Sequence, residues 1–130
     1  MRILQPAKWV RPRGYSHGIT AKGRWVFLSG IIGWDGQCRM VARDFCGQVR
    51  QALNNMVEVL AEADARPEHI VRMNWFVLSK KEYIEAYKEI GAIYREIIGR
   101  HYPAMTAVEV SGLLEDGARV EIEVTAVVPE

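Results

Sequence analysis

The sequence predicts a single α+β domain over residues 1–130, in which a mixed β-sheet carries two helices on one face. Its length is ordinary for one domain with a core of its own. Segments with apolar residues at three- and four-residue steps, which indicate helices, alternate with segments that are typical of strands. The order strand, strand, helix, strand, helix, strand, strand then favours helices packed together on one sheet face.

The first half contains one clear strand and one helix. Residues 24–30 are rich in aromatic and β-branched side chains and end at a glycine, which predicts a buried strand. Asp35-Gly36 marks a turn. Asp44 can then cap a helix, and its apolar face is predicted to consist of Phe45, Val49, Ala52, Leu53, Met56, Val59, Leu60 and Ala63.

The second half adds three strands and a helix. Residues 70–78 alternate Val71, Met73, Trp75 and Val77 with Ile70, Arg72, Asn74 and Phe76, as a strand with apolar surface on both faces. Ser79 and Glu82 have the spacing of a capping box, and the helix that follows runs to Gly99 along Tyr83, Tyr87, Ile90, Tyr94, Ile97 and Ile98. Strands at 104–111 and 119–128 are joined by the turn-prone Glu115-Asp116-Gly117.

Alternation in the last two strands predicts which side chains face the helices. The residues of the final strand that should face the helices are Val120, Ile122, Val124, Ala126 and Val128. Those expected on the opposite face are Arg119, Glu121, Glu123 and Thr125. In the strand before it, we assign Met105, Ala107 and Glu109 to the same face as the two glutamates, alternating with Thr106, Val108 and Val110. Such a face is either solvated or covered by another subunit.

Charge and composition exclude several classes of function. The 17 Lys and Arg residues are balanced by 16 Asp and Glu, so nucleic acid is not an expected partner. No apolar run approaches a membrane span and residues 1–20 lack a secretory leader, so we expect a cytoplasmic protein without a membrane partner. Cys38 and Cys46 are expected to be free thiols. The three histidines are scattered, and no metal site is predicted.

Well-known nucleophile and phosphate-binding motifs are absent, and only weaker candidates remain. Glu121 or Glu123 in a partly dry cleft could act as an acid or base, although both also fit a solvated strand face. Tyr15 in a loop could donate a hydrogen bond to a ligand or simply pack its ring. Trp34 could wall a pocket or cover the core. Arg11, Arg13 and Arg24 could hold an anion, although such arginines are usually solvated.

Five short motifs in one order resemble the RidA/YjgF family, also called the endoribonuclease L-PSP family. The segment Gly14-Tyr15-Ser16 resembles the family's G-P-Y-S, and residues 26–30 resemble its strand ending in S-G-Q. Residues 48–55 resemble its Q-x-x-Q-x-x-x-N helix. Residues 103–106 and 120–123 resemble P-A-R-S/T and V-E-I-E. The resemblance spans nearly the whole chain.

The resemblance implies a chorismate-mutase-like subunit, a homotrimer with inward-facing sheets, and three clefts between neighbouring subunits. The family's usual reaction is the hydrolysis of small enamine or imine intermediates to a carbonyl compound and ammonia, without a metal or organic cofactor. By this likeness Glu121 handles the attacking water and Tyr15 lines the cleft. Backbone N–H groups near Gly30 and Ile31, and those of Met105, Thr106 and Ala107, could supply fixed dipoles.

Departures from the family pattern bear on the substrate. Met105 replaces the arginine that binds a carboxylate, Ile31 stands where glutamine is common, and Ala107 replaces a frequent cysteine. A thioether cannot form a bidentate ion pair. We therefore expect poor activity on 2-imino acids derived from serine or threonine. A larger or less anionic intermediate is favoured, by analogy one from the breakdown of a nitrogen-containing aromatic compound.

Two other functions stay open at this point. A trimer that kept its cleft but lost catalysis would serve as a metabolite sensor or scaffold, and retention of Tyr15 and Glu121 argues against it. An RNA-cleaving or translation-inhibiting protein, as the older family name suggests, fits poorly with the near-neutral charge and the lack of a basic aromatic surface.

Overall fold

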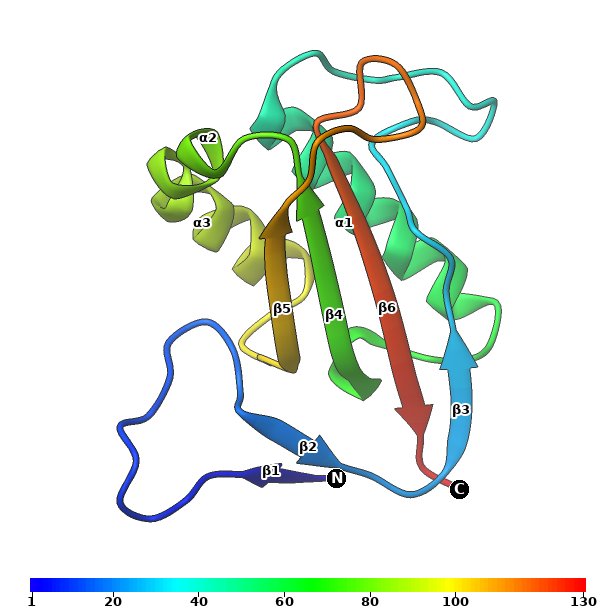
Figure 1. The fold of residues 1–130 in the computed structure, drawn as a ribbon. Coiled ribbons are helices and arrows are strands. Elements are labelled where there is room, and N and C mark those ends of the chain that lie inside the picture. The colour runs from blue at the N-terminus through cyan, green and yellow to red at the C-terminus, as the bar shows by residue number, and fades with distance from the viewer.

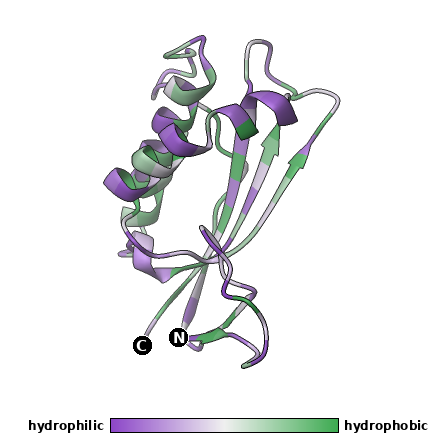
Figure 2. Cartoon of the chain, turned by 90° about the vertical axis from the view of Figure 1, so that its left-hand side faces the viewer, coloured by the Kyte–Doolittle hydropathy of each residue, from purple (hydrophilic) through white to green (hydrophobic).

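A four-stranded mixed sheet in the order β3-β6-β4-β5 forms the centre of the computed structural model, which describes residues 1–130. Strand β6 runs antiparallel to both of its neighbours, whereas β5 runs parallel to β4 (Figure 1). Figure 2 shows the helices on one face of this sheet, as the sequence predicts. The elements are β3 (Arg24–Phe27), α1 (Phe45–Ala61), β4 (Ile70–Val77), α2 (Lys80–Glu85), α3 (Tyr87–Ile97), β5 (Ala104–Glu109) and β6 (Val120–Val128).

The predicted first helix, α1, packs its apolar stripe against the sheet. Asp44 caps it by accepting a hydrogen bond from the backbone N–H of Gly47 at 2.9 Å. Of the predicted stripe, Val59 alone is largely exposed, at 48%. Five stripe residues have no exposed surface at all: Val49, Ala52, Leu53, Met56 and Leu60. The centre of the hydrophobic core therefore lies beneath α1.

The second predicted helix is divided in two. Ser79 caps α2 through its hydroxyl, which accepts a hydrogen bond from the Glu82 N–H. At Ala86 the backbone leaves the helical region, with φ −96° and ψ 5°, and α3 begins at the next residue. Gly99, at φ +94°, follows the end of α3 and adopts the left-handed conformation that glycine tolerates.

A bulge in β4 overturns part of the predicted alternation. The pairing with β6 shifts between Ile70 and Arg72, so Val71 is the extra residue. Ile70 therefore joins Met73, Trp75 and Val77 as a fully or almost fully buried residue, although strict alternation places it on the other face.

The predicted face of three β5 residues is wrong. Met105 and Ala107 pair with Met73 and Trp75, and because paired residues of neighbouring strands share a face, they point to the helix side. Glu109 follows the same alternation. The residues of β5 that share the open face with the glutamates of β6 are instead Thr106 and Val108. Alternation alone does not say which of the two alternating sets of β5 residues faces the helices. The register between β5 and β4 determines the face of each set.

The first strand of the sheet is shorter and more exposed than predicted. Strand β3 ends at Phe27, and its Trp25 and Phe27 are 60% and 71% exposed rather than buried. After it, Ile31 pairs with Ile122 through two backbone hydrogen bonds of 2.8 and 2.9 Å. The turn at Glu115 closes as predicted, with a bond from the Ala118 N–H to the Glu115 carbonyl. The strands on either side of it do not pair, because β4 lies between them.

A separate hairpin of β1 (Arg2–Leu4) and β2 (Gly18–Thr20) lies below the sheet, next to the lower end of β5 in Figure 1. The loop that joins these two strands returns to the main domain at Ser16. The backbone N–H of Ser16 donates to the Pro103 carbonyl at 3.0 Å, and its hydroxyl donates to the Tyr102 carbonyl. These bonds fix the loop beside the start of β5.

Candidate functional site

A cleft opens between α3 and β5, on the helix side of the sheet. It has a volume of about 790 Å³ and nine hydrophobic residues among its fourteen lining residues. The N-terminal loop contributes Pro12 to Tyr15, and β5 contributes Met105 and Ala107. Three of the predicted site residues, Tyr15, Met105 and Ala107, therefore meet in one cavity.

The loop position of Tyr15 follows from its neighbour. Because Ser16 is buried and bonded to Tyr102 and Pro103, the ring of Tyr15 is held next to the beginning of β5. The ring also contacts His17 edge-on, at a centroid distance of 5.8 Å. Tyr15 remains 41% exposed and so faces the cleft with its ring accessible.

Two further tyrosines stack on the wall of the cleft. The rings of Tyr94 and Tyr102 are nearly parallel, with centroids 5.5 Å apart. The hydroxyl of Tyr94 donates to the His101 carbonyl at 2.6 Å. Burial, followed by the charge that Tyr102 would carry, raises the pKa of the Tyr94 hydroxyl far above its usual range. Tyr94 is therefore a neutral, structural part of the wall.

The predicted catalytic carboxylate lies on the opposite face of the sheet. Glu121 of β6 packs directly over Gly30, because a Cβ atom added to this glycine would lie 2.3 Å from Glu121 Oε2. Only a glycine leaves room for the carboxylate at this point. Ile31, the next residue, is held by its two bonds to Ile122. Gly30, Ile31 and Glu121 thus form a second group of predicted site residues.

The two glutamates of β6 differ in their partners. Glu123 accepts a hydrogen bond from the Asn74 side chain at 3.0 Å, and none of the chain's ion pairs or side-chain hydrogen bonds involves the carboxylate of Glu121. Glu121 is also partly buried, whereas Glu123 is exposed. Of the two carboxylates, Glu121 is the one that is partly buried and has neither oxygen hydrogen-bonded within the chain.

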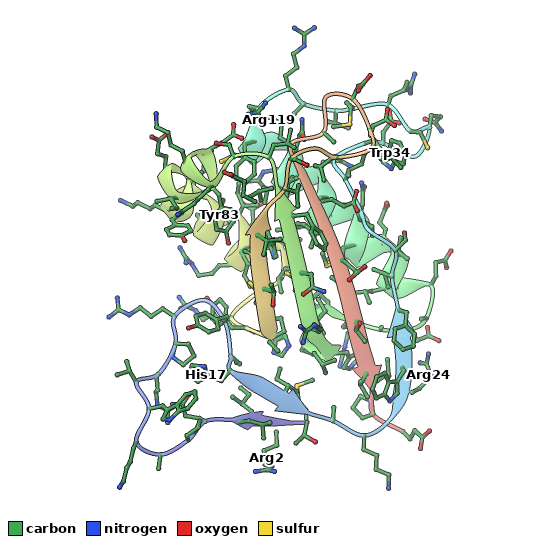
Figure 3. The ribbon with its side chains drawn as sticks, in the orientation of Figure 1. Arg2, His17, Arg24, Trp34, Tyr83 and Arg119 are labelled. Carbon is green, nitrogen blue, oxygen red and sulfur yellow. The ribbon has the colours of Figure 1, made fainter.

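Thr106 and Trp34 lie apart from the cleft. Thr106 is exposed on the open face of β5, where it pairs with Asn74. Trp34 belongs to the loop before α1, and its carbonyl accepts a hydrogen bond from the Asn55 side chain at 2.7 Å. Figure 3 shows Trp34 and Arg119 at one end of the sheet and His17, close to Tyr15, at the other.

The structure also identifies cleft residues that the sequence did not. Trp75, Tyr83, Tyr87, Arg95 and Tyr102 line the cavity. The helical spacing of Tyr83 and Tyr87 predicted a core-facing stripe. The choice of tyrosine rather than leucine at these positions was the available signal, because a phenol hydroxyl needs water or a hydrogen-bond partner.

Other candidate centres are not assembled by the fold. No three His, Cys, Asp or Glu side chains converge in a way that could hold a metal ion. The longest helix, α1, has 17 residues, and none combines the length and apolar character needed to cross a bilayer. Arg24 donates to the Ala63 carbonyl near the end of α1 and takes no part in the cleft.

Comparison with known sequences gives relatives that extend over most of the chain. Residues 9–128 match the family model described as Endoribonuclease L-PSP. A RutC family protein from Aquifex aeolicus is 32% identical over 130 residues, which cover 98% of this chain and 99% of that protein. A Salmonella typhimurium protein named 2-iminobutanoate/2-iminopropanoate deaminase is 32% identical over 116 residues, which cover 87% of this chain and 86% of the relative.

Solved structures include close matches in fold. A protein of unknown function of the Rid family from Yersinia pestis, YyfB, superposes with a TM-score of 0.83 at 29% identity, over 98% of both chains. Rv2704 from Mycobacterium tuberculosis, a member of the YjgF/YER057c/UK114 family, gives a TM-score of 0.66 at 29% identity, over 89% of this chain and 88% of the other.

Proposed function

This chain belongs to the endoribonuclease L-PSP family, which includes the RidA/YjgF proteins, and we propose that it hydrolyses an enamine or imine intermediate to a carbonyl compound and ammonia. The observation that carries the proposal is the partly buried carboxylate of Glu121, which has no partner within the chain and lies against the backbone of Gly30. One relative is named for imine deamination.

The proposed chemistry needs one carboxyl group and one water molecule. An enamine first accepts a proton at carbon and becomes an iminium ion. The oxygen of water then bonds to the iminium carbon while Glu121 takes a proton from the water. Protonation of the amine nitrogen by Glu121 breaks the C–N bond, ammonia leaves, and loss of the hydroxyl proton gives the carbonyl compound. Such proton transfer contributes roughly 10²- to 10⁴-fold to a rate.

Glu121 and Tyr15 lie on opposite faces of one sheet, so the proposal places the reaction between subunits. In the proposed homotrimer, the open face of each sheet is covered by a neighbour, and the cleft residues of one subunit meet Gly30 and Glu121 of the next. Two features support this arrangement. Trp25, Phe27 and Val108 are 60%, 71% and 42% exposed on the open face, and β5 is an edge strand whose outer side is bridged only at Ala104, by Ser16.

Light scattering tests the assembly. A mass of three chains is expected at micromolar concentration, whereas a stable monomer would remove the shared cleft and with it the proposed pairing of Tyr15 with Glu121.

Ammonia release from a panel of enamines and imines tests the chemistry. Glu121→Gln is expected to keep the assembly and to lower kcat by roughly 10²-fold or more on the best substrate. Glu123→Gln is the matched control, because it changes the same atoms on the same strand face two residues away, where the carboxylate is exposed and accepts a hydrogen bond from Asn74. An unchanged kcat in Glu121→Gln would contradict the proposal and favour a non-catalytic binding protein.

The substitution at Met105 predicts weak activity on 2-iminopropanoate and 2-iminobutanoate. A charge-assisted hydrogen bond from position 105 to their carboxylate is missing, which corresponds to about 1.5–3 kcal/mol. Met105→Arg is therefore expected to raise kcat/KM on these two compounds. If the unaltered protein already processes them efficiently, the role assigned to Met105 is wrong.

A further inference from the structure

Six of the fourteen residues that line the cleft between α3 and β5 are aromatic. All five tyrosines of the chain line it, together with Trp75. Tyr83 lies between Trp75 and Tyr87, with ring centroids 6.0 and 5.2 Å away and all contacts edge-on. Figure 3 shows Tyr83 beside the upper end of β5. Aromatic faces and edges grouped in this way suit a flat ring.

Two features inside the cleft favour an aromatic ligand with polar atoms. The indole N–H of Trp75 is buried and has no hydrogen-bond acceptor within the chain. Buried donors are normally paired, so this one is an exception that calls for a partner. Met105 lies on the same wall, and a thioether makes favourable contacts with an aromatic ring where the family's arginine would bind a carboxylate.

The charged residues of the cleft are all cationic. Arg13 and Arg95 are among its lining residues, and no Asp or Glu is. Neither arginine takes part in any of the five ion pairs of the chain. A smaller adjoining pocket of about 220 Å³ shares Tyr15 and Tyr102 and adds Arg11 and Arg100, again without a carboxylate. Within one chain, an anion in the cleft would therefore meet two arginines and no carboxylate.

Gly91 explains how Arg95 reaches the cleft. A Cβ atom at Gly91 would lie 3.2 Å from Arg95 Nη1, so the guanidinium rests over the space that a side chain would occupy. Glycine in the middle of a helix destabilises it relative to alanine. Gly91 lies inside α3 and lines the cavity, so its lack of a side chain favours this position of the guanidinium.

We propose that this cleft binds a flat aromatic carboxylate, with its ring against Trp75, Tyr83 and Met105 and its carboxylate held by Arg13 and Arg95. This inference rests on the proposed function, because it names the class of substrate that would bind in the cleft lined by Tyr15. The anion is held at the rim by arginines of the N-terminal loop and α3, rather than by position 105 of β5.

Calorimetric titration of the full-length protein with three probes separates ring from charge. Naphthalene-2-carboxylate has both features, naphthalene-2-carboxamide has the ring without the charge, and 2-oxobutanoate has the charge without the ring. The first is expected to bind at least about tenfold more tightly than either of the others. Equal affinity for the carboxylate and the carboxamide would overturn the proposal.

Arginine variants locate the anion. Arg13→Gln and Arg95→Gln are each expected to weaken naphthalene-2-carboxylate binding by about tenfold and to leave the carboxamide unaffected. Arg43→Gln is the matched control, because Arg43 is exposed before α1 and does not line the cleft. Effects of the two cleft variants no larger than that of the control would overturn the proposal.

Gly91→Ala gives a test whose two readouts move in opposite directions. The added methyl group requires the Arg95 guanidinium to shift by a few tenths of an ångström and is expected to weaken carboxylate binding, while the melting temperature stays the same or rises because alanine favours the helix. Unchanged affinity in both Gly91→Ala and Arg95→Gln would remove Arg95 from the site and overturn the proposal.

Failure of this inference is distinguishable from failure of the proposed function. Ammonia release from imines without binding of naphthalene-2-carboxylate would overturn the ligand class alone. Binding that shows the expected arginine dependence, in a protein that releases no ammonia from any imine, would support the ligand class and overturn the hydrolase.

Discussion

The side chains beneath α1 and those beside α3 lie on the same face of the sheet but differ in how closely they pack, and we call them the first and the second layer. Beneath α1 the side chains are aliphatic and fully buried, with Leu53, Met56 and Leu60 at 0% exposure. Beside α3 the buried isoleucines are joined by tyrosines, Tyr87 is 56% exposed, and a cleft of about 790 Å³ lies between the helix and β5. The first layer is therefore closed, and the second leaves space for a ligand.

The difference shows that apolar residues at helical spacing do not by themselves decide whether a helix packs against the sheet without leaving a gap. Both helices have residues at three- and four-residue steps, but branched aliphatic side chains interdigitate without gaps. Tyrosine carries a hydroxyl that needs a hydrogen-bond partner, and its ring is rigid, so a row of tyrosines leaves room at the sheet edge. We expect substitutions to be costly in the first layer and tolerated in the second.

The largest expected contrast comes from placing the same charge in each layer. Met56→Arg puts a guanidinium into the fully buried layer beneath α1 and is expected to cost more than about 4 kcal/mol of unfolding free energy. Met105→Arg puts it into the open cleft and is expected to cost no more than about 1 kcal/mol. Urea unfolding followed by circular dichroism measures both, and similar losses would break the comparison.

Removal of apolar atoms should show the same contrast on a smaller scale. Leu53→Ala leaves a cavity in the fully buried layer and is expected to lower the unfolding free energy by about 2–5 kcal/mol. Tyr87→Ala removes a larger side chain that is mostly exposed, and the expected loss is about 1 kcal/mol from its contact with Tyr83. The same urea titrations decide between the layers, and a larger loss for Tyr87→Ala would reverse their roles.

A buried amide beneath α1 sharpens the comparison for polar groups. Gln48 is fully buried, and its side chain donates to the carbonyls of Ala42 and Gly117 and accepts from the Arg119 N–H at 2.7 Å. Gln48→Ala leaves these three backbone groups without a hydrogen-bond partner and is expected to lower the unfolding free energy by about 1–3 kcal/mol.

Gln51→Ala is the control for Gln48→Ala, because its amide donates only to Asn55 within α1. Its expected cost is within about 0.5 kcal/mol. If thermal unfolding gave equal losses for the two variants, the buried bonds of Gln48 would not be the source of the effect.

The smallest expected effect concerns the two thiols. Burial raises the pKa of Cys46, near the start of α1, from 9.0 to about 11, with the Glu89 carboxylate adding to the shift, whereas Cys38 lies exposed in a loop. At pH 8 an aromatic disulfide reagent is expected to label one thiol per chain rapidly, and Cys38→Ser is expected to abolish that phase.

The raised pKa of Cys46 also fixes the sign of a pH effect on stability. Because the folded pKa lies above the unfolded value, the contribution of the neutral thiol is complete below pH 9 and is lost as the pH rises through about 11. Comparison of the unfolding free energies of Cys46→Ser and the unaltered protein between pH 8 and pH 11 measures this contribution.

In the labelling experiment described above, rapid reaction of both thiols at pH 8 would contradict the burial of Cys46.

Sequence reasoning predicted the elements of the fold better than their register. The cap at Asp44 and the stop at Gly99 are local features, so they could be read from neighbouring residues. The bulge at Val71 and the direction in which Met105 points depend on how distant strands align, and alternation leaves two solutions for each strand. The face of Glu121 was predicted correctly because Val120, Ile122 and Val124 form an unbroken apolar series.

The candidate site was only partly predictable for the same reason. Motif likeness pointed to Tyr15 and Glu121, but their separation on opposite faces of one subunit follows from the bonds of Ser16 to Tyr102 and Pro103, which join residues far apart in the sequence. The proposed carboxylate binding by Arg95 depends on its contact with Gly91, one helical turn earlier, at the rim of the cavity. The spacing of these two residues is the same on any exposed helix face, so the sequence alone does not reveal the contact.

The attachment of Ser16 to the start of β5 has a consequence for the timing of events in the molecule. Its hydroxyl bond to Tyr102 links residues 86 positions apart, so the loop can dock only after β5 has been ordered. The hydrophobic core can thus form before the loop of Tyr15 and Ser16, which is the floor of the cleft, docks against it. Two hydrogen bonds hold that floor, which allows the loop to detach without global unfolding. The hydrogen-exchange rate of the Ser16 amide would then report the opening and closing of the cleft in the absence of any ligand.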